Sequence, residues 1–442
     1  MESRGDPRAA AGLLHPCLDG NPAADRSGPE DPARAGPGRA RTLSDFRLFL
    51  AGRFFAALAL QMQSVAIGWY LYDRTGEAMA LAYAGLAVFV PIALFSLPGG
   101  DVADRVDRRW ILGTAHLAQA AGSLVLFLMT FTRTEQTWPF YAVLSLAGTA
   151  RAFSGPAVQS LLPFLVTRER FPAAVAWSSS AQQSATVLGP AVGGLIYLAG
   201  APASFAACSV ASLAVATCWF SIRGRGGIAQ TARGSAVSRV LEGLRYLRVN
   251  RVLLGAISLD LFAVLLGSIT ALLPIYARDI LRVGPDGLGL MRSSVAVGAV
   301  AMGLALAQLP AARQAHAGRS LFLGVAVFGL GALAFAVSKN LFFSLGMLAL
   351  MGAADMMSVF VRSSVVQLGT PDEMRGRVSA VHSLFVGTAN ELGDFRAGAM
   401  AAWLGAVPAV LAGGCATLAV VAVWSWLFPE LRRVERLAEV KA

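Results

Sequence analysis

Residues Pro98 to Gly113 read PGGDVADRVDRRWILG, a dense charged stretch between two runs that are almost free of charge. The run Ala78 to Gly100 carries no charged side chain, and the run Trp110 to Thr132 contains only His116. Each run exceeds the roughly 20 residues that a helix needs to cross the hydrocarbon core of a bilayer. Six charges within the nine residues from Asp101 to Arg109 require water or lipid headgroups. The stretch therefore predicts a loop at one membrane face, between two membrane-spanning helices.

The composition of the whole chain agrees with a membrane protein. Of its 442 residues, 56% are hydrophobic and 14% are charged, whereas an average soluble domain has about 25% charged residues. The net charge of +11 is scattered through short loops, which argues against a nucleic-acid-binding face. The four cysteines, Cys17, Cys208, Cys218 and Cys415, show neither metal-ligand spacing nor a disulfide framework. We expect no metal and no cofactor.

Twelve apolar segments follow Leu43, which predicts an all-α, polytopic protein with twelve transmembrane helices. They run over 47–72, 78–100, 110–132, 138–166, 174–199, 202–222, 252–277, 287–309, 320–338, 341–368, 378–404 and 407–428. The uncharged stretch Phe171 to Ile222 is too long for one crossing, since its 52 residues would form a helix of about 78 Å. We expect it to fold back at Gly200 to Pro202.

The segments divide the chain into five parts. Residues 1–42 are predicted to form a disordered cytoplasmic tail, 43–222 and 251–428 two six-helix bundles, and 429–442 a second cytoplasmic tail. Between the bundles, 223–250 is predicted to be a cytoplasmic linker with an amphipathic helix along the inner leaflet. The apolar face of this helix comprises Val237, Leu241, Leu244 and Leu247. Arginines are concentrated in the loops that share one side, so both termini are expected in the cytoplasm.

The two halves carry matching motifs, which indicates an internal repeat. Gln159, Pro163, Arg168 and Arg170 follow the fourth segment of the first half, and Gln367, Pro371, Arg375 and Arg377 occupy the corresponding positions in the second half. The stretch LPAARQAHAGRSLFLG, residues 309–324, is a worn counterpart of the opening stretch. An internal repeat is harder to obtain by chance than one loop motif, and therefore favours two pseudo-repeat bundles.

The opening stretch resembles the signature loop between helices 2 and 3 of the major facilitator superfamily of secondary transporters. The residues that match are Gly100, Asp104, Arg105, Arg108, Arg109 and Leu112. Asp107 departs from the pattern, because the family usually has glycine there, and Asp is less suited to a left-handed turn. The resemblance implies a conformational gate in which Asp104 helps to hold the cytoplasmic side closed. The alternative is a basic loop that only sets orientation.

Ionisable residues inside the predicted spans are costly and therefore informative. They are Arg53 on helix 1, Arg151 on helix 4, Asp260 on helix 7, Asp355 and Arg362 on helix 10, and Glu391, Asp394 and Arg396 on helix 11. Helices 1, 4, 7 and 10 line the central cavity in the superfamily.

For these residues the sequence predicts two roles. Arg151, Asp260, Asp355, Glu391 and Asp394 are expected to couple transport to protons, the role of Arg151 resting on its likeness to a family arginine. Arg53, Arg362 and Arg396 are expected to line the cavity or to form salt bridges. The alternative is that all of them form static ion pairs between helices.

The segment GPAVGG on helix 5 resembles the GPxxGG signature of drug and metabolite antiporters within the superfamily. Gly189, Pro190, Gly193 and Gly194 form it. Proline bends a helix and glycine permits close helix contact, so we expect a packed hinge between the halves. The alternative is an ordinary packing face of small residues.

Across nearly the whole chain the sequence is similar to the enterobactin-exporter-like branch of the superfamily. The stretches GWYLYDRTG, RAFSGPAVQSLLP, RGRVSAV and NELGDFRAG carry this similarity. It implies a monomeric proton-coupled antiporter in the inner membrane of a bacterium that exports a siderophore or an amphipathic drug-like molecule. The expected partners are thus a small molecule, protons and lipid, with no nucleic acid.

Two alternatives to export stay open. One is a proton-coupled importer, and the other is a membrane enzyme or receptor on the same scaffold. Catalysis is disfavoured because we find no nucleophile motif or His-rich metal pattern. The two lysines, Lys339 and Lys441, also lie outside any nucleotide-binding loop, which disfavours a primary pump.

Overall fold

The computed structural model describes residues 37–134, 136–223, 236–308 and 317–434. Parts of four predicted segments lie outside these ranges: 1–36 of the N-terminal tail, 224–235 of the linker, 309–316 of the repeated motif, and 435–442 of the C-terminal tail. The chain divides into the units Met1–Ala40 and Arg41–Ala442. The packing described below belongs to the second unit.

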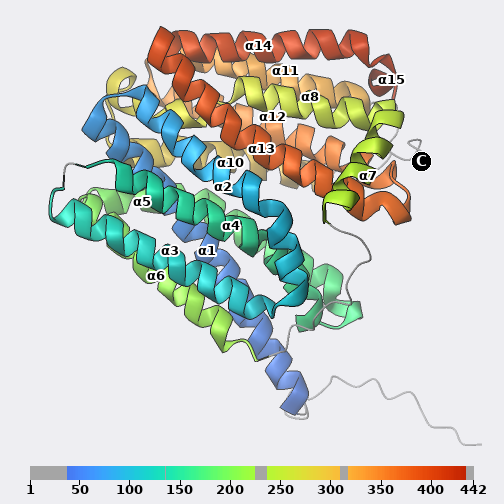
Figure 1. The fold of residues 1–442 in the computed structure, drawn as a ribbon. Helices are drawn as coiled ribbons and strands as arrows, with labels where there is room; N and C mark the ends of the chain where they lie inside the picture. The colour runs from blue at the N-terminus through green and yellow to red at the C-terminus, as the bar shows by residue number, and fades with distance from the viewer. Residues whose placement is uncertain (1–36, 135, 224–235, 309–316, 435–442) are drawn as a thin grey trace, which may run out of the picture. The chain divides into compact units, whose positions relative to one another are not determined.

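All regular structure in the described ranges is helical (Figure 1). The first half contains α1 (Pro37–Thr75), α2 (Ala78–Arg105), α3 (Arg108–Phe131), α4 (Trp138–Leu165), η2 (Arg168–Arg170), α5 (Phe171–Tyr197) and α6 (Ala201–Ser221). The second half contains α7 (Ala236–Val249), α8 (Arg251–Gly267), η3 (Thr270–Leu272), α9 (Leu273–Ile275), η4 (Tyr276–Ile280), α10 (Pro285–Gln308), α11 (Ala317–Ala336), α12 (Leu341–Leu368), α13 (Asp372–Leu404), α14 (Ala406–Leu427) and α15 (Pro429–Arg432).

Nine helical segments of the described chain are long and apolar enough to cross a membrane, if α8 through η4 are taken as one segment, Arg251–Ile280. Three further helices, α4, α5 and α13, have 28, 27 and 33 residues and are not among these nine. Of these, α4 contains Arg151 and α13 contains Glu391, Asp394 and Arg396, while α5 contains no charged residue. The structure thus confirms an all-α polytopic fold, and nine of the twelve predicted spans qualify by apolarity alone.

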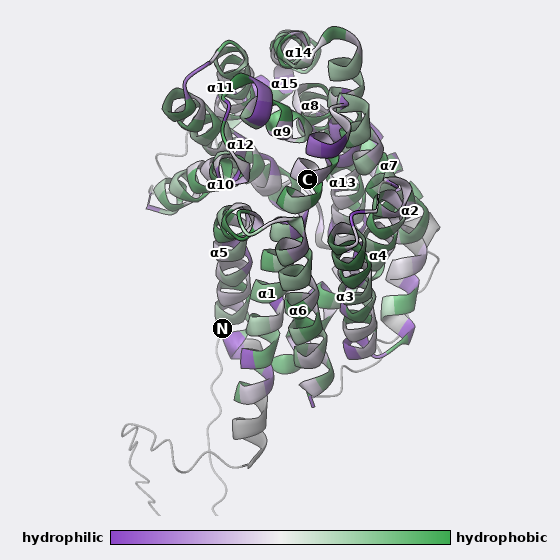
Figure 2. Ribbon diagram, turned by 90° about the vertical axis from the view of Figure 1, so that its left-hand side faces the viewer, coloured by the Kyte–Doolittle hydropathy of each residue, from purple (hydrophilic) through white to green (hydrophobic). Residues whose placement is uncertain are grey.

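The exposed surface of these helices is apolar, as expected for helices that contact lipid. Large apolar side chains are exposed in the middle of long helices, such as Val210 on α6 and Leu330 on α11. Most turns of the long helices are apolar in Figure 2. Exposure of this extent on every long helix is unfavourable in water and favourable in a bilayer.

Each half has its own helix packing, and two helix pairs make the most extensive contacts between the halves in the described chain. In the first half α3 packs on α6 and α4, and α2 packs on α4; in the second, α12 packs on α10 and α11, and α14 on α8 and α11. The joining pairs are α5 with α10 and α2 with α13 (Figure 1). One buried apolar cluster contains residues of both halves, including Leu71, Phe205, Tyr276 and Phe335.

The connection between α2 and α3 is shorter than predicted. α2 continues to Arg105 and α3 begins at Arg108, so most of the predicted loop is helical. A helix can extend into the headgroup zone with its charges solvated, and nothing between Gly100 and Arg105 breaks it. Asp107, which stands where the family usually has glycine, is not in a left-handed turn: its φ is −59°, and its carboxylate caps α3 by accepting a hydrogen bond from the backbone N–H of Arg109.

The seventh span is broken, whereas the sequence predicted one continuous segment from 252 to 277. α8 ends at Gly267, and the chain then passes through Ser268 and Ile269 into the short helical turns η3, α9 and η4. Irregular backbone at membrane depth is tolerated where it lies inside the protein or lines a cavity. This break contributes to the site described below.

The amphipathic helix α7 packs against the second half, and its predicted position along the inner leaflet stays a prediction. Leu247 is buried in the apolar core of that half, while Leu241 of the predicted apolar face is exposed. Glu242 of α7 forms an ion pair of 3.0 Å with Arg377 of α13. A β-carbon at Gly243 would lie 2.7 Å from the carbonyl oxygen of Arg377, so the two helices are in close contact.

The predicted reversal near Gly200 is confirmed and has a counterpart in the second half. α5 ends at Tyr197 and α6 begins at Ala201, with Gly200 at a φ of +100°. Gly405 holds the corresponding position between α13 and α14, with a φ of +88°. Both positions favour glycine because other residues rarely adopt a positive φ.

Candidate functional site

A cavity of about 280 Å³ lies between the two halves. It is lined by α1, α2 and α4 from the first half and by η3, α9, α10 and α13 from the second. Its polar lining residues are Gln61, Gln63, Ser64, Arg151, Arg292, Glu391 and Asp394. We call this space the central cavity.

An ion pair crosses the central cavity from one half to the other. The Nη1 of Arg151 on α4 lies 3.0 Å from the Oε1 of Glu391 on α13. The Glu391 side chain is 16% exposed and the Arg151 side chain 39%, so water partly screens the pair. The sequence predicted both residues as coupling residues, and the structure brings them into direct contact.

Asp394 lies one helical turn from Glu391 and contacts the break in the seventh span. The hydroxyl of Ser268 donates to Asp394 Oδ1 at 2.5 Å, and the backbone N–H of Ala271 also donates to this carboxylate. The carbonyl of Ser268 accepts from Nη2 of Arg396 at 3.2 Å. Ser268 in the broken segment therefore contacts both an acidic and a basic side chain of α13, Asp394 and Arg396.

Arg292 is a cavity residue that the sequence analysis missed. Its guanidinium donates to the Ser64 hydroxyl on α1, across the halves. The signal was present, because an arginine stands inside the predicted eighth segment, 287–309. With Arg151 it gives the cavity two cationic groups beside the carboxylates of Glu391 and Asp394.

The other predicted charges lie away from this group. Arg53 donates to the side-chain oxygen of Gln182 on α5, within the first half. Asp260 on α8 and Arg362 on α12 form an ion pair in the interior of the second half, where both side chains are at most 7% exposed. Asp355 shares with Asp260 the lining of a separate cavity of about 20 Å³. The predicted coupling residues thus fall into two places.

Breaking the Asp260–Arg362 pair should destabilise the protein more than it affects any cargo-binding step. Arg362→Leu leaves a buried carboxylate without its partner, a change that costs about 3–5 kcal/mol. The double variant Asp260→Leu/Arg362→Leu removes both charges and should recover most of that loss. Thermal unfolding of the purified protein in detergent measures both effects. Equal unfolding temperatures for the single variant and the wild type would contradict a structural role for the pair.

The GPAVGG segment packs tightly against both halves. A β-carbon at Gly193 would lie 2.8 Å from the Cα of Met62 on α1, and one at Gly194 would lie 2.4 Å from the carbonyl oxygen of Pro285 on α10. Gly289 of α10 in turn faces Pro190, whose carbonyl oxygen would lie 2.5 Å from an added β-carbon. A β-carbon at Gly189 would lie 2.6 Å from the Cβ of Gln61 on α1. Any β-carbon at Gly193, Gly194 or Gly289 would overlap backbone atoms.

Ser293 of α10 inserts its hydroxyl into the bend of α5. The hydroxyl donates to the carbonyl of Val187 at 2.7 Å and accepts from the N–H of Ala191 at 3.2 Å. In a regular helix Ala191 would bond directly to Val187, four residues earlier. Pro190 disturbs that ladder, and a side chain of the other half closes the gap. The sequence carried no signal for this contact.

At the turn between α2 and α3, the described contacts of Arg108 and Arg109 join elements of the first half. Arg108 is buried; its Nε donates to the Ser160 hydroxyl at 2.9 Å, and its guanidinium lies 4.8 Å from the Phe164 ring centroid. Arg109 pairs with Asp107 at 2.6 Å and donates to the carbonyl of Ile222 at 2.5 Å. Hydrogen bonding from Arg109 lowers the pKa of the Asp107 carboxyl below its usual range.

The remaining residues of the predicted gate are Gly100, Asp104 and Arg105. Arg105 is exposed, and a β-carbon at Gly100 would meet no described atom within 4 Å. The side chain of Asp104 lies outside the described part of the structure. The gate role of this turn stays a prediction.

A second set of polar contacts joins the halves at the far end of α1. The Tyr72 hydroxyl donates to the carboxylate of Asp279 on η4. Arg278 lies 3.4 Å from Asp73 as an ion pair and donates to the carbonyl of Tyr72 at 3.1 Å. The sequence did not predict this cross-half contact.

Residues 41–441 match the family model described as transmembrane secretion effector. Macrolide efflux protein A of Streptococcus pyogenes is 28% identical over 265 residues, which cover 59% of this chain and 65% of that protein. The chain thus spans less than two thirds of that relative. The enterobactin exporter of Escherichia coli is 22% identical over 410 residues, 89% of this chain and 94% of that protein.

Solved structures show the same fold at low sequence identity. A peptide transporter superposes with a TM-score of 0.70 at 14% identity, covering 88% of this chain and 95% of the other. A bacterial homologue of the human lysosomal transporter Spinster, in an inward-facing and unoccupied conformation, gives a TM-score of 0.61 at 14% identity, covering 91% and 98%.

Proposed function

Because the chain belongs to the transmembrane secretion effector family of the major facilitator superfamily, we propose that it is a secondary transporter that exports a small amphipathic molecule by alternating access. We further propose that inward movement of protons drives the export. Such a protein is not an enzyme and needs no cofactor.

The observation that carries this proposal is the cross-half ion pair Arg151–Glu391 in the central cavity. A carboxylate that holds two halves together loses its attraction for arginine when it binds a proton. Protonation of Glu391, with Asp394 one turn away, therefore favours separation of the halves. Access from the two sides of the membrane and proton binding are coupled through this contact. Asp260 and Asp355 are second-rank candidates because the structure places them elsewhere.

We propose that both termini are cytoplasmic and that the protein resides in the inner membrane of a bacterium. The arginines of the α2–α3 turn and of the connection after α4 then face the cytoplasm, as the positive-inside rule requires. In this orientation the described contacts of Tyr72, Asp279 and Arg278 close the outer side.

The cargo class follows from the lining of the central cavity and from the relatives. The cavity combines apolar walls with two arginines and two carboxylates, which suits amphipathic molecules with charged or polar groups. One relative is named for macrolide efflux and another for enterobactin export. At about 280 Å³ the cavity is at the lower end of ligand pockets, so the halves must move apart to admit such cargo.

Transport by the purified protein in lipid vesicles tests this proposal. Vesicles with an imposed pH gradient are loaded with a panel of amphipathic cargoes, and the direction of cargo movement is followed with and without a protonophore. We expect movement against the cargo gradient and opposite to the proton gradient. Cargo and protons moving in the same direction would support the importer alternative. If no cargo moves in any gradient, a non-transport role on this scaffold gains support.

A further inference from the structure

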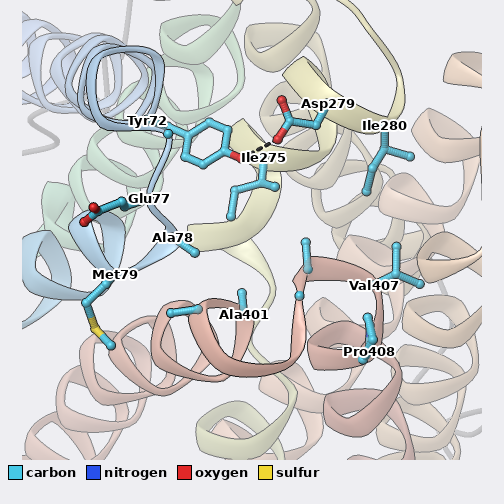
Figure 3. Close-up of a pocket in the computed structure, with 14 residues that line it drawn as sticks. Tyr72, Glu77, Ala78, Met79, Ile275, Asp279, Ile280, Ala401, Val407 and Pro408 are labelled. Carbon is cyan, nitrogen blue, oxygen red and sulfur yellow. Dashed lines mark hydrogen bonds between the residues drawn. The ribbon is translucent and has the colours of Figure 1, made fainter.

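A second and larger cavity lies at the end of the molecule remote from the α2–α3 turn. It measures about 670 Å³, and its lining includes Tyr72, Glu77, Met79, Asp279, Val407 and Pro408 (Figure 3). We call it the vestibule. It lies beside the start of α2, whereas the turn lies at the other end of that helix. Both halves contribute to it, through α1 and α2 on one side and through α9, η4, α13 and α14 on the other.

The vestibule follows the central cavity along the same helices. On α1, Gly68 lines the central cavity and Tyr72, four residues or about 6 Å further along, lines the vestibule. On α13, Asp394 and Ala401 stand in the same relation, about 10 Å apart. The buried apolar side chains of Leu71, Leu272 and Ile275 belong to the core near this end. The two cavities thus follow one another along α1 and α13, between the halves.

The charges of the two cavities differ. The central cavity has two arginines and two carboxylates. The vestibule has the carboxylates of Glu77 and Asp279, and within the described chain its lining includes no cationic side chain. The neighbouring Arg278 is not a lining residue, and its charge is paired with Asp73 at 3.4 Å. Figure 3 shows the Tyr72 hydroxyl directed at the Asp279 carboxylate, which retains further acceptor positions.

We propose that the vestibule is a second binding site, selective for amphipathic monocations, on the outer part of the export route. Apolar contact comes from the lining alanines and from Ile275, Met79, Val407 and Pro408. The counter-charge comes from Glu77 and Asp279. Its volume lies within the range of pockets that hold drug-sized ligands. The site's place on the route rests on the proposed export function, while the binding itself does not.

The test measures binding of two probes of similar size and opposite charge to the full-length protein in lipid nanodiscs. Tetraphenylphosphonium is the cation and tetraphenylborate the anion, each corrected for binding to empty nanodiscs. For the double variant Glu77→Gln/Asp279→Asn we expect cation affinity to fall on the order of tenfold, with no fall for the anion. The filling variant Val407→Trp should weaken the cation similarly without changing charge.

Asp286→Asn is the matched control. Asp286 lies in the first turn of α10, close in the chain to η4, and is not a lining residue of the vestibule. Its neutralisation removes one negative charge, where the double variant removes two, and should leave cation affinity within twofold. An equal loss in Asp286→Asn, or unchanged cation binding in both vestibule variants, overturns the proposal.

The outcome separates this site from the proposed function. If the vestibule variants bind the cation normally and the wild-type protein exports cargo, the vestibule site is overturned and the export function stands. A wild-type protein that binds the cation in the vestibule but moves no cargo in vesicles overturns the export function and leaves the binding site standing. Because Glu77 and Asp279 are exposed, their isosteric amides are compatible with folding.

Discussion

Replacing Gly194 with leucine is expected to abolish uphill export while the protein still inserts into the membrane. The β-carbon alone would lie 2.4 Å from the carbonyl oxygen of Pro285, and backbone on α10 cannot move aside as a flexible side chain can. The contact of α5 with α10 would be lost. The halves would then favour a conformation that is open where the end of α5 meets the start of α10. The overlap destabilises the observed conformation by about 1–3 kcal/mol or more.

The loss of export is measured in vesicles, and the loss of the α5–α10 contact is measured as a distance between the halves. Spin labels at Leu195 on α5 and Leu290 on α10, both exposed, report the separation of the two helices. We expect a longer distance in Gly194→Leu than in the labelled parent. Gly346→Leu is the control, because a β-carbon at Gly346 on α12 meets no described atom within 4 Å. Full export by Gly194→Leu, or equal damage from Gly346→Leu, would show that this contact is not part of the cycle.

Neutralising the carboxylates of α13 should uncouple export from protons. Glu391→Gln and Asp394→Asn keep the size of each side chain and remove its titration. Glu391 pairs with Arg151 of the other half, and Asp394 lines the central cavity beside Gly85 of α2, so both acids change surroundings when the halves separate. Each variant should lose export driven by a pH gradient and retain exchange of cargo down its own gradient.

Two comparisons make the result specific. Glu430→Gln removes a carboxylate that is paired with Arg251 at 3.2 Å and partly exposed, and it should leave coupled export unchanged. Thermal unfolding of each variant shows whether a loss comes from instability. Coupled export that persists in both α13 variants with the same pH dependence would falsify their role. Loss of every transport mode together with stability would indicate static ion pairs instead.

The sequence alone determined the helical plan and the helices that carry charge. Whether a segment can cross a bilayer depends on about 20 neighbouring residues, so hydropathy reveals it without knowledge of the fold. The rarity of charge in such segments singled out Arg151, Glu391 and Asp394, which the structure places together. The glycine at the α5–α6 reversal was also readable, because a positive φ is a local property.

Only the tertiary structure decided which charges are partners. Asp260 contacts Arg362 and not the central cavity, although helix spacing gave no sign of it. The rotation and tilt of each helix select the partner, and packing between helices sets them where hydropathy does not. For the same reason, the Ser293 contact with the bend of α5 and the Ser268 contact with Asp394 were not predictable. Each joins residues more than 100 positions apart, Ser293 and Val187 between the halves and Ser268 and Asp394 within the second half, and such pairs meet only once the helices are packed.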